Sequence, residues 1–318
     1  MPTKSKINNP NIKDISSFAA KPFLKWAGGK RQLLLKFRVL YPQHLINNLI
    51  KNYYEPFVGS GAVFFDIIRN YEVRNAYLYD INEELILIYR VVQQDVQKMI
   101  PILDNFNCVI HKRNKTKRRE YFYDQRYNYN LQRSKINFEK YSENWIFRAA
   151  QAIFLNKTCY NGLFRVNSTG EFNTPAGDYE NPKILDEANL LAVNRALQIA
   201  EIRKADFTEI INDLKNNSFV YLDPPYRPIS KTSSFTSYSK NNFTDADQVK
   251  LSQIFSLLDK EGAKVMLSNS DPKNLNPSDN FFDDLYCDFN IYRIPARRII
   301  NSNSSKRGVI NEIVVTNY

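Results

Sequence analysis

The stretch NNSFVYLDPPYRP, residues Asn216 to Pro228, carries a short apolar run directly into an aspartate, two prolines and a tyrosine. Phe219 to Leu222 include β-branched and aromatic side chains, a pattern typical of a strand that is covered on both faces. Pro224 and Pro225 fix φ and lack the N–H that a strand ladder needs, so the strand must end before them. The sequence therefore predicts a stiff turn at the carboxyl end of a buried strand, where open α/β sheets bind ligands. A plain strand terminator with a chance Asp and Tyr is the alternative interpretation of this stretch alone.

The composition is that of a globular protein with an excess of basic charge. The 318 residues are 43% hydrophobic and 14% aromatic, enough for one large α/β domain plus a smaller one. The net charge of +11 favours a polyanionic partner, nucleic acid first and an anionic membrane second. No apolar run approaches the ~18 residues of a membrane span. The three cysteines, which lack metal-ligand spacing, predict buried thiols in a cytoplasmic protein without a metal site.

Strand and helix patterns alternate at both ends of the chain and lapse in the middle. Strands are predicted at YYEPF (53–57), AYLYDI (76–81), SFVYLDPPY (218–226) and AKVMLSNS (263–270), with a C-terminal hairpin after them. Helical spacing dominates the middle of the chain. The fold class is therefore α/β, a mostly parallel sheet with an antiparallel edge strand and an inserted, mainly helical domain. The predicted division is a mobile N-terminal tail at 1–20, a catalytic domain at 21–90 and 191–318, and the insertion at 91–190.

A glycine turn and a strand-end carboxylate indicate a nucleoside site. EPFVGSGAVFF places Gly59, Ser60 and Gly61 between a predicted strand and a helix, and Asp80 ends the next strand. This spacing matches the carboxylate that accepts hydrogen bonds from a ribose in doubly wound folds. A dinucleotide site would need a third glycine where Phe64 stands, so a nucleoside-bearing cofactor without a pyrophosphate fits better.

Five stretches, taken in order, resemble the Dam-type DNA adenine methyltransferases: PFLKWAGGKRQLL, YYEPFVGSGAVFF, YLYDIN, NKTCYNGLFRVNSTGEFNTP and YLDPPY. The resemblance covers the chain from Lys21 to Tyr318. It implies a Rossmann-like methyltransferase sheet and transfer of a methyl group from S-adenosylmethionine to the exocyclic amino nitrogen of an adenine in duplex DNA. By motif, it implies these cofactor-binding residues: Trp26, Lys30, Phe57, Gly59, Ser60, Gly61, Asp80 and Asp223.

The chemistry of an amino group explains the turn that ends the strand. The lone pair of the adenine amino nitrogen is delocalised into the ring, and acceptors aimed at both N–H groups would localise it. Asp223 supplies one acceptor and the Pro224 carbonyl another, while the prolines keep that carbonyl fixed. Tyr226 offers a stacking face to a base that has left the duplex. We therefore predict Asp223, Pro224, Pro225 and Tyr226 as the catalytic residues.

The insertion carries the predicted DNA contacts. Residues 111–135 interleave basic and aromatic side chains, which suits nucleic acid and suits the solvated face of a helix equally well. Asn161 and Gly162 predict a hairpin-type turn that projects Leu163 and Arg165, and an arginine can pair with a guanine edge. The resemblance makes the insertion a target-recognition domain with these DNA-binding residues: Lys25, Tyr160, Asn161, Leu163, Arg165 and Pro175. Ala176 and Asp178 depart from the family pattern, and a carboxylate at 178 would repel phosphate.

The resemblance also suggests the target and the partners. It implies methylation at 5′-GATC, a self-complementary site that a monomer can methylate one strand at a time, with a restriction endonuclease as a possible partner. The Ser/Thr-rich tract at 228–243 is predicted as either a lid or a plain surface loop, and the basic tract at 292–308 as a phosphate clamp. The alternatives are a cytosine amino-methyltransferase, an RNA adenine methyltransferase, and a catalytically silent DNA-binding protein of the same fold.

Overall fold

The computed structural model describes residues 20–26, 28–227, 243–297 and 309–318. The predicted N-terminal tail, the Ser/Thr-rich tract up to residue 242 and the part of the basic tract at 298–308 lie outside the described residues. The predictions for these three segments therefore stay predictions.

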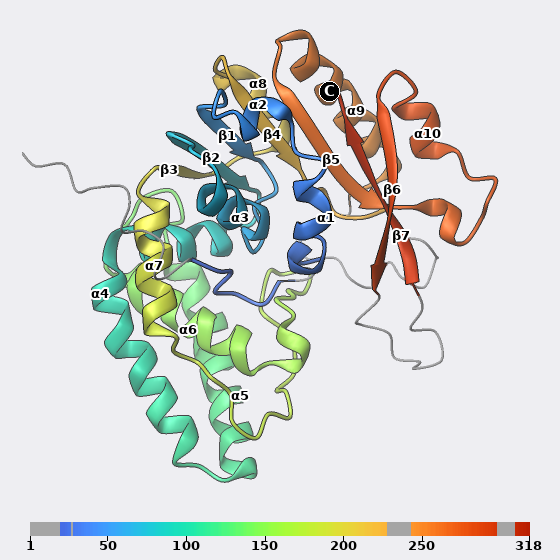
Figure 1. Cartoon of the computed structure of the whole chain (residues 1–318). Coiled ribbons are helices and arrows are strands. Elements are labelled where there is room, and N and C mark those ends of the chain that lie inside the picture. Colours follow the sequence, from blue (N-terminus) through green and yellow to red (C-terminus); the bar gives the residue numbers. More distant parts are fainter. Residues whose placement is uncertain (1–19, 27, 228–242, 298–308) are drawn as a thin grey trace, which may run out of the picture.

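Seven strands form one sheet in the order β3-β2-β1-β4-β5-β7-β6 (Figure 1). The strands are β1 (Asn52–Glu55), β2 (Asn75–Asp80), β3 (Ala200–Lys204), β4 (Ser218–Leu222), β5 (Lys264–Ser270), β6 (Asn290–Arg297) and β7 (Val309–Thr316). β1 to β5 pair in parallel, whereas β7 runs antiparallel to both β5 and β6. The prediction of a mostly parallel sheet with an antiparallel edge is confirmed. The reversed strand is β7, and β6 closes the edge outside it.

Successive strand residues point to opposite faces of the sheet and so build two separate cores. On one face, Tyr53 and Phe219 pack with side chains of α1 (Leu34–Arg38) and α3 (Ala62–Asn70). On the other face, their neighbours Tyr54 and Val220 pack with α8 (Ile210–Asp213), α9 (Asp245–Lys260) and α10 (Phe281–Leu285). Because both faces are covered, the central strands read as continuous apolar runs, as predicted for β4.

The insertion is a group of long helices below the sheet in Figure 1. It contains α4 (Glu83–His111), α5 (Lys115–Gln132), α6 (Asn144–Thr158) and α7 (Glu187–Leu197), while the short α2 (Gln43–Ile46) precedes β1. The Asn82 side chain caps α4 by accepting from two backbone N–H groups of its first turn. α4 runs through the predicted domain boundary at residue 90, and its side chains share one apolar cluster with the sheet. The division into a catalytic and a recognition domain stays a prediction.

Two expectations from composition can be compared with the structure. Cys159 is buried, but Cys108 and Cys287 are exposed, so the prediction of three buried thiols is wrong. Cys108 lies on the outer side of α4 and Cys287 in the turn after α10, where a small side chain needs no apolar partner. Within the described ranges, no helix is long and apolar enough to cross a membrane. No group of metal-ligating side chains is found in that part of the chain either.

The strand order reverses between β1 and β4, and this reversal places the candidate site. From β1 the sheet continues through β2 to β3 in one direction, and from β4 it continues to β5 in the other. Tyr54 is in register with Val220, so the parallel strands β1 and β4 end at the same edge. Open α/β sheets bind ligands in the crevice outside the carboxyl ends of two such strands. The glycine turn follows β1 and the DPPY tract follows β4, so both lie at this edge.

Candidate active site

Asp223 is the first residue of the DPPY tract, residues 223–227, which follows β4 after Leu222. Its Oδ1 atom lies 2.8 Å from the ammonium nitrogen of Lys30 and accepts a 3.1 Å hydrogen bond from the Ser268 hydroxyl. The Tyr221 hydroxyl is 2.7 Å from that of Ser268 and so helps to orient it. Burial raises the pKa of the Asp223 carboxyl, and Lys30 and Ser268 oppose the rise by stabilising the ionised form.

Lys30 also contacts the tyrosine at the end of the tract. Its side chain is only 4% exposed, and its ammonium lies 4.4 Å from the centre of the Tyr226 ring. The same ammonium donates a 2.7 Å hydrogen bond to the carbonyl of Gly28. The Tyr226 hydroxyl donates to the carboxylate of Glu312 on β7, and burial raises the pKa of both side chains. Lys30 and Glu312 therefore fix the Tyr226 ring from two sides.

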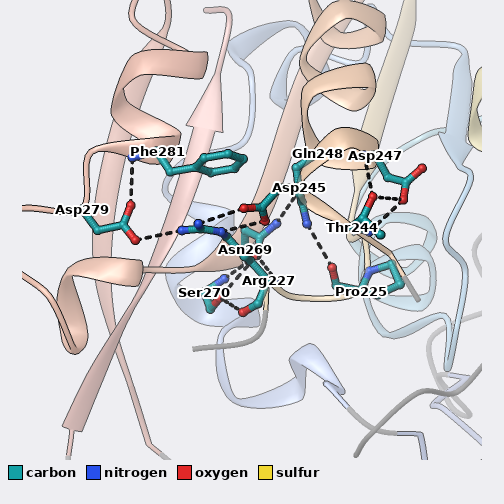
Figure 2. A network of polar contacts seen from close by, with 10 residues as sticks. All are labelled: Pro225, Arg227, Thr244, Asp245, Asp247, Gln248, Asn269, Ser270, Asp279 and Phe281. Atoms are coloured by element: carbon teal, nitrogen blue, oxygen red, sulfur yellow. Dashed lines mark hydrogen bonds and ion pairs between the residues drawn. The ribbon is translucent and has the colours of Figure 1, made fainter. Parts of the chain in front are cut away.

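The tract presents two hydrogen-bond acceptors that the described residues leave unused. Asp223 uses Oδ1 for both of its partners, and no described residue donates to its Oδ2. The carbonyl of Pro225 accepts from the side-chain amide of Gln248, as Figure 2 shows, whereas no donor in the described part of the chain reaches the carbonyl of Pro224. Two neighbouring acceptors that have no partner among the described residues suit a ligand that carries two N–H donors.

The glycine turn after β1 has the backbone conformation that its sequence predicts. Gly59 has φ of 46° and Gly61 has φ of 68°, in the left-handed region that favours glycine. A Cβ atom on Gly61 would lie 2.7 Å from the hydroxyl of Tyr89, which also donates to the carbonyl of Gly59. Ser60 between the two glycines is buried. No side chain larger than hydrogen fits at position 61 without moving Tyr89.

Asp80 lies beside this turn at the end of β2. Its carboxylate accepts a 3.3 Å hydrogen bond from the N–H of Gly59 and a 2.9 Å bond from the N–H of Asn82. Burial raises the pKa of the Asp80 carboxyl to about 6, although these backbone donors oppose the rise. The predicted pairing of a glycine turn with a strand-end carboxylate is thus present as a direct contact.

Aromatic side chains line the same region. A Cβ atom on Gly59 would lie 3.0 Å from the indole of Trp26, so that ring covers the turn. The Phe57 ring stacks on Phe207 at 5.5 Å and meets Phe243 edge-on at 5.9 Å. Phe207 and Phe243 were not predicted. Phe207 follows β3 just as Phe57 follows β1, and its position after a parallel strand is the signal that could have identified it.

The hairpin at residues 159–176, which is predicted to contact DNA, differs from its prediction in the position of its turn. Asn161 and Gly162 do have positive φ, 53° and 66°. The antiparallel bridges, however, join Cys159 to Ala176 and Val166 to Phe172, which puts the hairpin tip at residues 167–171. The predicted hairpin turn at 161–162 is therefore wrong.

The reason lies in what Gly162 packs against. Residues Tyr160–Gly162 form a single 3₁₀ turn within the first arm of the hairpin, directly after the bridge from Cys159 to Ala176. A Cβ atom on Gly162 would lie 2.3 Å from the Lys25 side chain. The positive φ values serve this close approach to Lys25, and the chain reverses only beyond Val166.

Lys25 and Trp26 join the 159–176 hairpin to the residues that are predicted to bind the cofactor. The buried Asn156 side chain accepts from the N–H of Lys25 and donates to its carbonyl, both at 2.8 Å. It also donates a 3.0 Å hydrogen bond to the carbonyl of Gly162. Trp26, which covers the glycine turn, stacks on Phe164 at 5.6 Å. Asn156 was missed because nothing in the sequence marks an amide on α6 as a partner of residue 25.

The remaining candidate DNA contacts lie along the same hairpin. Tyr160, Asn161 and Pro175 are exposed, and Leu163 and Arg165 are half-buried. The Arg165 guanidinium donates a 2.8 Å hydrogen bond to the side chain of Asn173 on the opposite arm, which restricts its orientation.

The carboxylate that departs from the family pattern is paired. Asp178 lies 2.7 Å from the ammonium of Lys115 in an exposed ion pair. The pairing reduces the repulsion of phosphate that Asp178 alone would cause, although such an exposed pair is weak.

Comparison with known proteins agrees with these features. The family model of the D12 class N6 adenine-specific DNA methyltransferases matches residues 26–300. The type II methyltransferase M.MjaIII of Methanocaldococcus jannaschii is 46% identical over 94% of this chain and 99% of its own length. The type II methyltransferase M1.LlaDCHI of Lactococcus lactis is 39% identical over 97% of this chain and 99% of its own. The DNA adenine methylase of Escherichia coli K12 is 30% identical over 92% and 94%. The resemblance found in the motifs is thereby confirmed, and the chain belongs to the D12 class N6 adenine-specific DNA methyltransferase family.

Proposed function

We propose that the protein transfers a methyl group from S-adenosylmethionine to the exocyclic amino group of an adenine that has left the stack of duplex DNA. The observation that carries this proposal is the pair of acceptors after β4, Asp223 Oδ2 and the Pro224 carbonyl, which no described donor uses. An adenine amino group has two N–H donors, so two adjacent acceptors can bind both and localise the nitrogen lone pair. The amino group of a base inside the duplex cannot reach these two acceptors, so the target must flip out.

Each residue of the tract has a separate task in this chemistry. S-adenosylmethionine, when bound, supplies an electrophilic methyl group. Asp223 and Pro224 orient the amino group, and the Asp223 charge stabilises the positive charge that develops on nitrogen. The raised pKa of Asp223 also lets its carboxylate accept the proton that the nitrogen must lose after transfer. Tyr226 stacks on the base, a contact worth about 1–3 kcal/mol in comparable sites.

The residues around the glycine turn fit S-adenosylmethionine. Asp80 is a partly exposed carboxylate at a strand end and can accept from two ribose hydroxyls. Trp26 and Phe57 supply aromatic faces beside the turn at Gly59. The remaining predicted cofactor residues, Lys30, Ser60, Gly61 and Asp223, line the same edge of the sheet.

The affinity for S-adenosylmethionine is expected to fall as the pH drops below about 6, because Asp80 has a pKa of about 6 in the free protein. Only the ionised carboxylate accepts two strong hydrogen bonds, so protonation weakens binding by up to about tenfold per pH unit below the pKa. Calorimetric titration between pH 5 and 7, without DNA, measures this. Asp80→Asn is the control, with weaker binding that no longer changes over this range. A wild-type affinity that is constant from pH 7 to 5 would contradict the assignment.

We propose 5′-GATC as the target and duplex DNA bound by a monomer. Lys25 and the 159–176 hairpin form one surface through Asn156 and Gly162, and both parts carry the family's recognition positions. Two relatives are named type II methyltransferases, which supports a cognate restriction endonuclease, while the Escherichia coli relative is named a DNA adenine methylase. The cytoplasmic location stays a prediction.

The direct test is single-molecule sequencing of DNA from cells that express the chain and lack other methylases. N6-methyladenine confined to GATC is the expected result. N6-methyladenine at another sequence would overturn the target alone, and N4-methylcytosine would overturn the base assignment. DNA without any new methylation, combined with normal duplex binding, would favour the silent DNA-binding alternative.

Arg165→Ala is expected to relax the target sequence and to leave cofactor binding intact. If Arg165 pairs with a guanine edge, its loss costs about 1–3 kcal/mol of discrimination at that base pair. The same sequencing experiment should then show methylation at sites altered at one guanine. Lys117→Ala on the exposed side of α5 is the matched control, because it removes one positive charge without touching the hairpin. An unchanged target in Arg165→Ala would exclude Arg165 as a base reader.

A further inference from the structure

Two buried amide side chains lie under the DPPY tract on the face of the sheet that α9 covers. Gln248 on α9 is 1% exposed and Asn269 on β5 is fully buried. A polar side chain in such a place is unfavourable unless its hydrogen bonds are satisfied. Figure 2 shows that both amides belong to one network that ends on the backbone of the tract.

The donors and acceptors of this network can be assigned in only one way. Asn269 Oδ1 accepts from the N–H of Ser270 at 2.8 Å and of Arg227 at 3.4 Å, so its Nδ2 is the atom that faces Gln248. That Nδ2 donates to Gln248 Oε1 at 3.2 Å. The Gln248 Nε2 therefore has to donate, and it does so to the Pro225 carbonyl at 3.2 Å. The backbone N–H groups of Ser270 on β5 and of Arg227 thus set the orientation of an amide that holds the tract.

Arg227 anchors the end of the same tract. Its guanidinium forms two hydrogen bonds with Asp245, at 2.8 and 3.0 Å, and a third with Asp279 at 2.8 Å. It also lies 4.2 Å from the ring centre of Phe281, and its carbonyl accepts from the Ser270 hydroxyl. Figure 2 shows these contacts on the side of the tract opposite the pyrrolidine of Pro225. The backbone of the tract is therefore held at residues 225 and 227.

These contacts divide the polar groups of the tract into two sets. The Pro225 carbonyl and both backbone groups of Arg227 are engaged by the network, whereas the Pro224 carbonyl has no donor among the described residues. Asp223 is fixed from the other end by Lys30. Two peptide groups lie between Asp223 and Pro225, and the second of them carries the Pro224 carbonyl.

We propose that Gln248 and Asn269 are positioning residues for methyl transfer: by fixing the Pro225 carbonyl they aim the Pro224 carbonyl at the amino group of the target base. This inference rests on the proposed function. Replacing an ordinary core residue would affect folding and leave the turnover of the folded enzyme unchanged. Replacing Gln248 or Asn269 is expected to lower that turnover.

The first test compares Gln248→Leu with wild type in steady-state methylation of a GATC duplex. Removing the donor is expected to lower kcat by about 10–100-fold, since a misplacement of about 1 Å can cost about 100-fold in rate. KM for DNA and Kd for S-adenosylmethionine should stay within about threefold, because Gln248 is buried under the tract. Ser252→Ala is the matched control. It removes a buried hydroxyl from the same helix. Among the described residues that hydroxyl bonds only to the carbonyl of Val249 in α9, so kcat should not change.

The second test uses Gln248→Glu and remains informative if Gln248→Leu does not fold. A protonated glutamic acid can donate to Pro225 and accept from Asn269 as glutamine does, whereas a carboxylate cannot donate. The ratio of its kcat to that of wild type should therefore rise as the pH falls. A pH-independent ratio, or wild-type kcat in folded Gln248→Leu, would overturn the inference while the proposed function stands. A wild-type protein that methylates no adenine would overturn both.

Discussion

Asp223→Ala is expected to lower kcat by about 10³-fold or more and to leave the affinity for duplex DNA within about threefold. Electrostatic stabilisers and proton acceptors each contribute about 10²–10⁴-fold in other enzymes, and Asp223 is proposed to act as both. Its carboxylate contacts Lys30 and Ser268 at the end of β4, and Asp223 lies outside the 159–176 hairpin that is proposed to read the target. Single-turnover methylation and a DNA-binding assay on the same preparation measure the two effects separately.

A second variant separates chemistry from folding. Asp223→Ala leaves the buried ammonium of Lys30 without its carboxylate, which destabilises the protein as well. Asp223→Asn keeps an oxygen for Lys30 and Ser268 but removes the negative charge, so it should fold better and still lose most of the activity. Because burial raises the pKa of Asp223, wild-type kcat should also fall on the acid side, at a pH above the ordinary range of an aspartate. Turnover within tenfold of wild type in Asp223→Asn would show that the charge is not required.

Local sequence signals predicted the parts of the site that depend on neighbouring residues. Two successive prolines cannot continue the ladder of a central strand, so the exit from β4 followed from Pro224 and Pro225 themselves. The contact between Asp80 and the turn at Gly59 followed from a spacing that parallel strands impose. The Asn-Gly pair at 161–162 predicted a hairpin-type turn, and Asn161 does have positive φ, but φ alone does not say where the chain reverses. That position depends on the packing of Gly162 against Lys25, which are far apart in sequence.

The side chains that hold the DPPY tract in place come from distant segments, and no local sequence pattern predicts that these segments meet. Ser268 and Asn269 end β5, Glu312 lies on β7, and Gln248 occupies one turn of α9. Each is an ordinary polar residue in its own stretch. It acquires a partner only when β5 and β7 pair beside β4, so sequence analysis could identify the tract and not what holds it.

Glu84→Leu is expected to lower the free energy of unfolding by about 3–5 kcal/mol, because it leaves the Arg148 guanidinium buried without a carboxylate. The Glu84 and Arg148 side chains are 4% and 1% exposed, and they pair across 64 residues of sequence. Arg148 also donates to the carbonyl of Tyr129 at 2.9 Å, so the pair joins α4, α5 and α6. Urea unfolding followed by circular dichroism measures the loss.

The double variant Glu84→Leu/Arg148→Met decides whether that loss comes from the uncompensated charge of Arg148 or from the missing hydrogen bonds of the pair. Replacing a whole buried ion pair by apolar side chains is often neutral, so the double variant should be more stable than Glu84→Leu alone by at least about 2 kcal/mol. Arg148→Met alone should be milder, since Arg133 lies 2.6 Å from Glu84 and still compensates its charge. A double variant as unstable as Glu84→Leu would mean that the helices need the hydrogen-bonding geometry of the pair itself. In that case the carboxylate of Glu84 would set the relative positions of α4, α5 and α6. Because these helices belong largely to the proposed recognition domain, the loss of stability should be accompanied by a loss of target selectivity in the folded protein.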